Sequence, residues 1–202
     1  MITLPEFKEL VFEEKSHRYL LNGYSIPSVT TIMKPLSNAH YGSIDQEVLK
    51  KAANKGTIVH DAAENYMLFG VEDIAPEFEG YFYAFKKWTM DYNPIPIKPE
   101  YRLYHKVLNY AGTADLPCYI SGKLALVDYK TTATIAESLT RVQLEAYRKA
   151  LASHGFDFER KLIVQLRNDG TYKVAEYETV DNEGWKVFTE LLDVHRYIKK
   201  YK

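Results

Sequence analysis

Two short stretches, Gly112-Thr113-Ala114-Asp115-Leu116 and Leu126-Val127-Asp128-Tyr129-Lys130-Thr131-Thr132, decide the fold of this chain. The residues between them are typical of two β-strands joined by a turn at Ser121-Gly122. With those two residues as the loop, Asp115 lies opposite Asp128 across the hairpin. Because side chains alternate between the two faces of a strand, Lys130 lies on the same face as Asp128.

The facing carboxylates indicate a bound cation. Like charges directly opposite each other destabilise a hairpin, and a hard divalent metal ion between Asp115 and Asp128 would remove that conflict. Lys130 would then orient or deprotonate a water molecule, or stabilise developing negative charge, as phosphodiester hydrolysis requires. The alternative is a set of solvated surface charges, but the apolar run Leu124-Ala125-Leu126-Val127 predicts a buried strand. Pro117 weighs against the hairpin, since proline cannot donate to the ladder and predicts an edge or a bulge.

Further motifs occur in the order found in a known nuclease family. Gly56-x-x-x-His60 comes before these two stretches, and Gln143-x-x-x-Tyr147 comes after them. This order resembles the RecB-like branch of the PD-(D/E)XK nuclease superfamily. The segment Ile26-Pro27-Ser28-Val29-Thr30-Thr31-Ile32 is similar to one in phage-encoded RecB-like exonucleases and in mitochondrial genome maintenance exonucleases. The resemblance spans roughly residues 10–180.

The expected metal ligands are Asp115 and Asp128, with the backbone carbonyl of Tyr129 as a third oxygen. The resemblance adds His60 as a ligand and makes Lys130 catalytic together with the two aspartates. Oxygen ligands and a phosphate substrate favour one or two Mg²⁺ or Mn²⁺ ions. A lysine between carboxylates that forms only a structural ion pair is the alternative.

His60 lies on a predicted helix, where a single histidine is more often a core or surface residue than a ligand. Gly56, one turn earlier, is interpreted as allowing this helix to approach the sheet closely enough for His60 to reach the metal. Glu64 shares the face of His60 and is expected to be structural. His105 is expected to be a partly exposed strand residue.

Three other residues are assigned by the resemblance. Glu100 resembles an acidic residue at the start of the strand before Asp115, and it is expected to assist catalysis by supporting the metal water or Lys130. An ordinary edge-strand charge is an equal alternative. Gln143 and Tyr147 are four residues apart on a predicted helix and face the same way. The resemblance places both against the DNA backbone, whereas amphipathic helix patterning is the alternative.

Hydrophobic periodicity and turn residues predict the elements along the chain. The predicted strands cover 11–12, 18–21 and 24–26 around an Asn22-Gly23 turn, then 98–108, 111–120, 123–130, 160–167 and 172–178, and the predicted helices cover 28–33, 43–69, 76–92, 135–154 and 181–201. The first helix is expected to stop before Pro35. This order predicts an α/β fold with a mixed central sheet. It agrees with the restriction-endonuclease-like αβββαβ core implied by the resemblance, with an N-terminal hairpin and helical additions.

Residues 1–202 are expected to form one nuclease domain. Its parts are an N-terminal hairpin with a short helix (1–35), a helical region (43–92), a catalytic core (98–180) and a C-terminal helix (181–202). The hydrophobic content of 46% and charged content of 26% are those of an ordinary globular protein. The net charge of −1 excludes the global basic field of a coat protein for nucleic acid, so any DNA contact must come from a local groove.

The single cysteine, Cys118, excludes an intramolecular disulfide and a four-cysteine iron–sulfur cluster, so no such cluster is expected. No signal peptide and no apolar run of transmembrane length are visible, which predicts a cytoplasmic protein without a membrane partner. If the chain is phage-encoded, the cytoplasm is that of the bacterial host. No Gly-x-x-x-x-Gly-Lys loop is present, so unwinding of DNA by this chain is not expected.

The leading hypothesis is a divalent-metal-dependent DNA exonuclease in phage DNA recombination, repair or replication. Its expected partners are DNA that is single-stranded or has a single-stranded end, and a recombination or replication protein. A flap- or branch-specific endonuclease of the same fold stays open, because the sequence does not show the surface around the site. A non-catalytic DNA-binding subunit of a recombination complex and a carboxylate-rich structural protein are further alternatives. The intact Asp115, Asp128 and Lys130 argue against the subunit.

Overall fold

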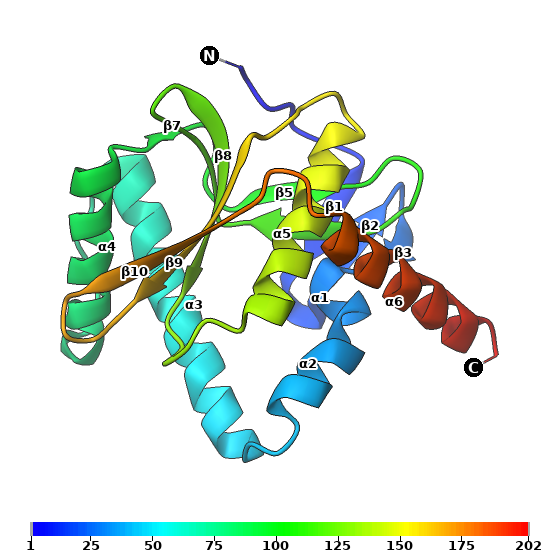
Figure 1. Ribbon diagram of the computed structural model, residues 1–202, viewed down its shortest axis with the longest axis horizontal. Coiled ribbons are helices and arrows are strands. Elements are labelled where there is room, and N and C mark those ends of the chain that lie inside the picture. Colours follow the sequence, from blue (N-terminus) through cyan, green and yellow to red (C-terminus); the bar gives the residue numbers. More distant parts are fainter. Residues whose placement is uncertain (1, 202) are drawn as a thin grey trace.

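The structure is a computed structural model that describes residues 2–201. A central five-stranded sheet separates two helical layers (Figure 1). Helices α3 (Gln46–Phe69) and α4 (Glu79–Tyr92) cover one face, and α5 (Glu137–Ala152) covers the other, with α6 (Asn182–Lys200) packed on α5. Within residues 2–201, no helix combines the length and apolar character needed to cross a lipid bilayer.

The central sheet has the strand order β10-β9-β8-β7-β4. Its members are β4 (Ile95–Pro96), β7 (Leu116–Ile120), β8 (Lys123–Lys130), β9 (Arg160–Leu166) and β10 (Tyr172–Tyr177). Strands β8 and β9 are parallel, and the other neighbours are antiparallel, which confirms the predicted α/β fold with a mixed sheet. Two smaller sheets contain β1 (Leu10–Glu13), β2 (Arg18–Leu21) and β3 (Tyr24–Ile26), and β5 (Tyr101–Tyr104) with β6 (Ala111–Ala114).

The predicted β7–β8 hairpin and its register are confirmed. Leu116 pairs with Val127, and Ile120 pairs with Lys123 across the Ser121-Gly122 turn. Pro117 lies inside β7 without disturbing this ladder. Its carbonyl accepts a hydrogen bond from the amide of Ile97 on the β4 side, so its missing N–H also faces that side rather than β8.

The prediction of one continuous strand over 111–120 was wrong, because the chain changes sheets at Asp115. Residues before it, in β6, pair with β5, and residues after it, in β7, pair with β8. The Asp115 carboxylate accepts the backbone amide of Tyr129 at 2.8 Å, and its own carbonyl accepts the amide of Glu100 at 2.9 Å. The residue at the break therefore joins both ladders.

Two other predicted boundaries were also wrong. Pro35 does not end helical structure but lies in the first turn of α2 (Lys34–Tyr41), directly after α1 (Val29–Ile32). Proline is tolerated there because the first amides of a helix have no partner within it. The predicted strand over 98–108 is only β5, and His105 lies past its end, where Nδ1 accepts the amide of Leu108 at 3.1 Å.

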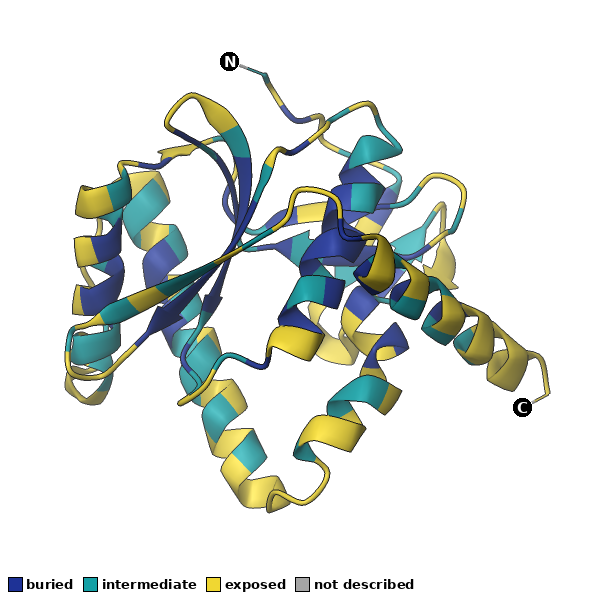
Figure 2. Ribbon diagram, viewed as in Figure 1, coloured by how far each residue is buried: buried dark blue, intermediate teal, exposed yellow. Residues whose placement is uncertain are grey.

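Alternating side chains of β8 divide the interior into two clusters. In Figure 2 the buried residues lie along the central strands and on the helices that flank them. Leu126 packs in the cluster under α5. Val127 and Tyr129 pack on the opposite face with Phe85 and Trp88 of α4. The end of β8 is therefore held from both sides, which fixes the backbone of the residues that form the candidate site.

Candidate active site

The candidate site lies at the C-terminal end of β8. Lys130 Nζ is 2.5 Å from Asp128 Oδ2, so the prediction that these residues share a face is confirmed. On α5, the side-chain amide of Gln143 donates to Asp128 Oδ1 at 3.1 Å. Asp128 is only 2% exposed; Gln143 donates to Oδ1, whereas Oδ2 has the Lys130 ammonium as an ion-pair partner and no hydrogen bond of its own.

Three side chains from separate segments form a potential metal site beside this pair. His60, Glu100 and Asp115 each offer one ligand atom, a ring nitrogen or a carboxylate oxygen, and these three atoms lie within 4.8 Å of one another. His60 Nδ1 is 3.4 Å from Asp115 Oδ2 and 3.9 Å from Glu100 Oε1. The other ring nitrogen, Nε2, is 3.1 Å from the carbonyl oxygen of Tyr129. Because a carbonyl only accepts, Nε2 carries a hydrogen, and Nδ1 faces the two carboxylates.

The environment of Glu100 fits a cation. Its backbone has φ +45°, a region that residues with a side chain seldom adopt and that is often found at functional sites. Burial, followed by the charge of Asp115 and of further carboxylates, raises the pKa of Glu100 to about 8. Ionising this group is costly as long as no positive charge lies among the carboxylates. Two carboxylate oxygens and one imidazole nitrogen are a ligand set that suits Mg²⁺ or Mn²⁺.

Burial and the attraction between the two charges together determine the pKa values of Asp128 and Lys130. Burial raises the pKa of Asp128 to about 6, although the neighbouring ammonium opposes this shift. Burial pulls the pKa of Lys130 down, but the charges of Asp128 and Asp115 outweigh it and leave the pKa raised. Lys130 therefore keeps its proton at neutral pH. The Lys130 side chain is still 26% exposed, and it lines the adjoining groove.

Gln143 and Tyr147 face the same way, as their spacing predicts, but only Gln143 reaches the site. The Gln143 side-chain amide also donates to the hydroxyl of Tyr147 at 3.1 Å. Tyr147 is only 4% exposed, so it lies in the core and presents no surface to a ligand. It contacts Gly112, where an added Cβ would be 2.5 Å from the Tyr147 ring. The glycine of the Gly-x-x-Asp stretch is therefore needed for packing.

Replacing Gly112 with alanine is expected to lower the free energy of unfolding by about 1–3 kcal/mol, the usual cost of overpacking a core. The Tyr147 ring is buried and hydrogen-bonded, so it cannot move aside freely. Gly56→Ala is the matched control, because a Cβ there would meet only Thr131 Oγ1, at 3.9 Å. Denaturant unfolding would compare the two. Equal stability of both variants would contradict the packing role of Gly112.

The same comparison corrects the interpretation of Gly56. A distance of 3.9 Å is an ordinary van der Waals contact, so the absence of a side chain at Gly56 is not what lets His60 reach the site. His60 is placed instead by Val59 and the other buried residues of α3, which pack against the central sheet. Gly56 lies along a groove that leads to the site.

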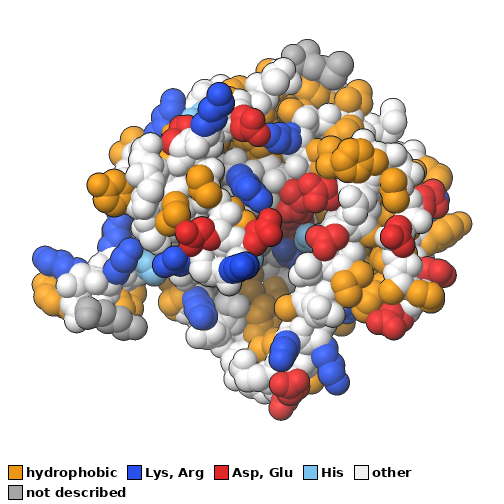
Figure 3. Space-filling model, turned by 180° about the vertical axis from the view of Figure 1, so that it is seen from behind, with side chains coloured by type: hydrophobic (Ala, Val, Ile, Leu, Met, Phe, Trp, Pro, Cys, Tyr) orange, Lys and Arg blue, Asp and Glu red, His pale blue; other side chains and the backbone are white. Residues whose placement is uncertain are grey.

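That groove runs between α2 and α3 and ends at the candidate site. Its walls include Tyr41 at the end of α2, Leu49 and Thr57 on α3, and Thr132 after β8. His60, Glu100 and Lys130 also line it. Figure 3 shows acidic side chains gathered close to a histidine near the middle of the hollowed face. The sequence assigned no role to Tyr41, which belongs to no motif, or to Thr132, which ends the stretch around Asp128 and Lys130.

Six of the predicted site residues lie in two adjoining groups. His60, Glu100 and Asp115 form one group, and Asp128, Lys130 and Gln143 form the adjoining one. The Tyr129 carbonyl lies against His60. Glu64 is half-buried on α3, where burial raises its pKa, and His105 lies in a turn away from the site.

No family model matches this chain, and no curated protein is significantly similar to it. Among solved structures, a proposed exonuclease from Eubacterium rectale aligns with a TM-score of 0.49 and 11% identity, over 69% of this chain and 64% of that one. The alkaline exonuclease LHK-Exo from Laribacter hongkongensis aligns with a TM-score of 0.39 and 14% identity, over 75% of this chain and 96% of that one. Both scores are below 0.5, so we base the functional proposal on the residues of this chain.

Proposed function

We propose that this chain is a divalent-metal-dependent deoxyribonuclease of the RecB-like type, one nuclease domain that removes nucleotides from DNA ends. The observation that carries the proposal is the position of the His60, Glu100 and Asp115 group directly beside the Asp128–Lys130 pair. A metal site next to a protonated lysine, at the end of an open groove, is suited to binding and hydrolysing a phosphodiester. The motif order supports a place in phage DNA recombination, repair or replication.

The proposed ligands are His60, Asp115, Asp128 and the carbonyl of Tyr129, and we add Glu100 because its carboxylate lies with His60 and Asp115. When bound, the metal ion would polarise the scissile phosphate and make water a better nucleophile. His60 is pre-oriented for this role, since its Nε2–H is held by the Tyr129 carbonyl and Nδ1 faces Asp115 and Glu100. Asp115 is fixed by the Tyr129 amide through Oδ2, the oxygen that also lies 3.4 Å from His60.

Lys130 acts as a fixed positive charge in this proposal. Its raised pKa keeps the ammonium protonated, so it stabilises negative charge on the phosphate instead of removing a proton from water. Asp128 orients Lys130, and Gln143 in turn orients Asp128. Tyr147, which is buried, positions Gln143 and does not contact DNA.

The groove between α2 and α3 is the proposed path of the DNA strand. In Figure 1 these two helices extend beyond the edge of the central sheet and converge at residues 42–45. Exposed Lys50 and Lys51 lie on the first turns of α3, near the outer end of the groove. A single strand could then contact lysines at the entrance and Lys130 at the inner end. This arrangement favours single-stranded DNA or a single-stranded end as the substrate.

Mn²⁺ is expected to raise the melting temperature, and the increase should grow with pH. At a Mn²⁺ concentration of about 100 times the Kd, the stabilisation is about 2.7 kcal/mol, or roughly 5–10 °C for a chain of this length. Glu100 has a pKa of about 8 without metal, so at lower pH a proton competes with the cation. Without metal, the folded protein binds the Glu100 proton more tightly than the unfolded chain does, in which the pKa of Glu100 is about 4.5. The metal-free protein should therefore lose stability as the pH rises from about 4.5 through about 8. Melting curves at pH 6, 7, 8 and 9 would measure both trends.

Glu100→Gln is the control for this pH dependence. The variant cannot ionise at this position, so the stability of the metal-free protein should fall less with pH and the Mn²⁺ shift should be smaller. Glu178→Gln, on an exposed residue before α6, should behave like the unmodified protein. A Mn²⁺ shift that is the same at every pH would contradict the role of Glu100.

Digestion of DNA labelled separately at its 5′ or 3′ end tests the function itself. Single-stranded, double-stranded, flapped and circular DNA would be incubated with Mg²⁺, Mn²⁺ or EDTA. Metal-dependent shortening from one end supports the exonuclease and gives its polarity. Cleavage of circles or at flap junctions would favour an endonuclease instead. No cleavage of any substrate with either metal would refute the catalytic proposal.

A further inference from the structure

A second cavity shares part of its wall with the groove that leads to His60. It lies between α1, α2 and the first turns of α5. Tyr41, Lys130 and Thr132 line both spaces. A ligand whose anionic part lies against Lys130 can therefore place another part of itself in this cavity.

The surface of the cavity is more apolar than polar, although threonine and serine side chains also line it. Met33 follows α1, Ala136 and Leu139 lie at the start of α5, and all three are residues of the main hydrophobic cluster. The half-buried ring of Tyr41 stands at the boundary with the groove. An apolar space with an aromatic ring and an ammonium group at its edge matches a nucleotide, which has a flat, largely apolar base and an anionic phosphate.

Few polar groups in the cavity remain to recognise the edge of a particular base. The Thr140 hydroxyl is already bonded to the hydroxyl of Tyr177 at 2.7 Å. The side-chain amide nitrogen of Gln143 makes its hydrogen bonds to neighbouring side chains. The Thr30 and Thr132 hydroxyls also line the cavity, and both are already bonded within the protein, Thr30 to the Ser28 hydroxyl at 3.0 Å and Thr132 to the carbonyl of Thr134 at 2.8 Å. The Ser37 hydroxyl and the Gln143 carbonyl oxygen are left, which is little for distinguishing four bases. We therefore expect any base to be accepted.

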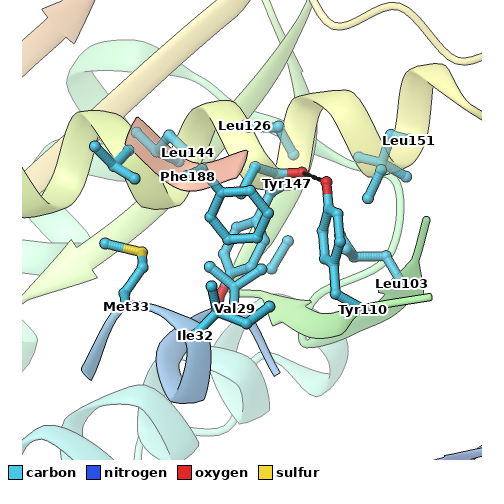
Figure 4. Close-up of a cluster of buried hydrophobic side chains, with 14 of the residues drawn as sticks. Val29, Ile32, Met33, Leu103, Tyr110, Leu126, Leu144, Tyr147, Leu151 and Phe188 are labelled. Carbon is cyan, nitrogen blue, oxygen red and sulfur yellow. Dashed lines mark hydrogen bonds between the residues drawn. The ribbon is translucent and has the colours of Figure 1, made fainter. Parts of the chain in front are cut away.

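The segment Ile26–Ile32, noted in the sequence, holds this cavity in place. Val29 and Ile32 of α1 are fully buried and point toward Leu144, Tyr147 and Phe188 (Figure 4). The side chain of Ser28 caps α1 by accepting the amide of Thr31 at 3.0 Å. Because α1 is fixed against α5 and α6, Met33 and the following helix α2 form a stable wall of the cavity.

We propose that this cavity receives the base of the nucleotide whose phosphate lies at Lys130. The inference rests on the proposed nuclease function and extends it. A base that is stacked and paired in a duplex cannot enter a separate cavity, so the nucleotide must be unpaired and rotated out of the strand. The base cavity would thus make the protein act on single-stranded ends and select against paired ones.

Binding of oligonucleotides in EDTA tests this without any cleavage. One single strand carries a normal base at every position, and matched strands carry an abasic residue at the 5′ or 3′ end. The unmodified protein is expected to bind the normal strand about 5- to 100-fold more tightly than the strand that is abasic at the reactive end, as base–aromatic stacking predicts. A 2-aminopurine base at that end should show fluorescence quenching on binding.

Variants then assign the preference to the cavity. Tyr41→Ala and the cavity-filling Ser37→Phe should remove most of the preference, whereas Tyr41→Phe should keep it. Tyr24→Ala, at an exposed tyrosine of β3, is the matched control and should change nothing. Equal affinity for normal and abasic ends, in a protein that still cleaves DNA, would overturn the base cavity alone. Absence of both binding and cleavage would overturn the nuclease proposal as well.

Discussion

Replacing Lys130 with alanine should lower the rate of DNA cleavage by about 10²–10³-fold, the usual effect of removing one preorganised electrostatic contact to the transition state. The ammonium is held 2.5 Å from Asp128 and stays protonated, so its loss removes a fixed positive charge beside the phosphate. Single-turnover cleavage of end-labelled DNA at saturating Mg²⁺ would measure the effect on the chemical step.

The matched control is Lys123→Ala, an exposed lysine at the other end of the same strand. It should leave the cleavage rate within about twofold of the unmodified protein, as expected for a solvated surface charge. Lys130→Ala should still fold and should still be stabilised by Mn²⁺, since Lys130 is not a proposed ligand. A loss of less than about tenfold would show that Lys130 is not catalytic.

Replacing Glu145 with alanine should lower the free energy of unfolding by about 3–5 kcal/mol. Glu145 is completely buried and binds two cations, Arg148 at 2.6 Å and Lys161 at 2.5 Å. Lys161 is also completely buried, and burial lowers its pKa despite the nearby carboxylate. Without Glu145, both cations lose their shared counter-charge inside the protein. Denaturant unfolding would measure the change.

Two comparisons separate buried charge from general loss of packing. Lys161→Met added to Glu145→Ala should recover part of the lost stability, because it removes one of the uncompensated charges. Glu176→Ala breaks an exposed ion pair with Arg160 and should cost no more than about 1 kcal/mol. If Glu145→Ala were as mild as Glu176→Ala, the buried network would not contribute as proposed.

The features that the sequence predicted well depend on neighbouring residues. The apolar run before Asp128 and the Ser121-Gly122 turn specify the β7–β8 hairpin and its register, because both the alternation of side chains and the turn are local properties. The shared face of Asp128 and Lys130 follows from the same alternation. The Asn22-Gly23 turn is confirmed in the same way, with both residues at positive φ between β2 and β3.

The errors arose where distant segments compete for the same residue. Asp115 fits a continuous strand by composition, but its carboxylate binds the Tyr129 amide and its carbonyl binds Glu100, so the ladder changes partner there. Proline is excluded from a helix interior but is tolerated in a first turn, and Pro35 lies in the first turn of α2 because a new helix begins directly after the buried α1. The first outcome depends on residues distant in the sequence, and the second on how α1 packs against α5 and α6.

Local patterns in the sequence are enough to predict the mixed α/β fold, the β7–β8 hairpin and the shared face of Asp128 and Lys130, since periodicity and turn chemistry act over short distances. The packing of helices against sheets brings Glu100 to His60 and Asp115, buries Tyr147, and places Tyr41 at a cavity beside Lys130. These residues come from different helices and sheets. Their proximity depends on how those helices and sheets pack, which no local sequence pattern predicts.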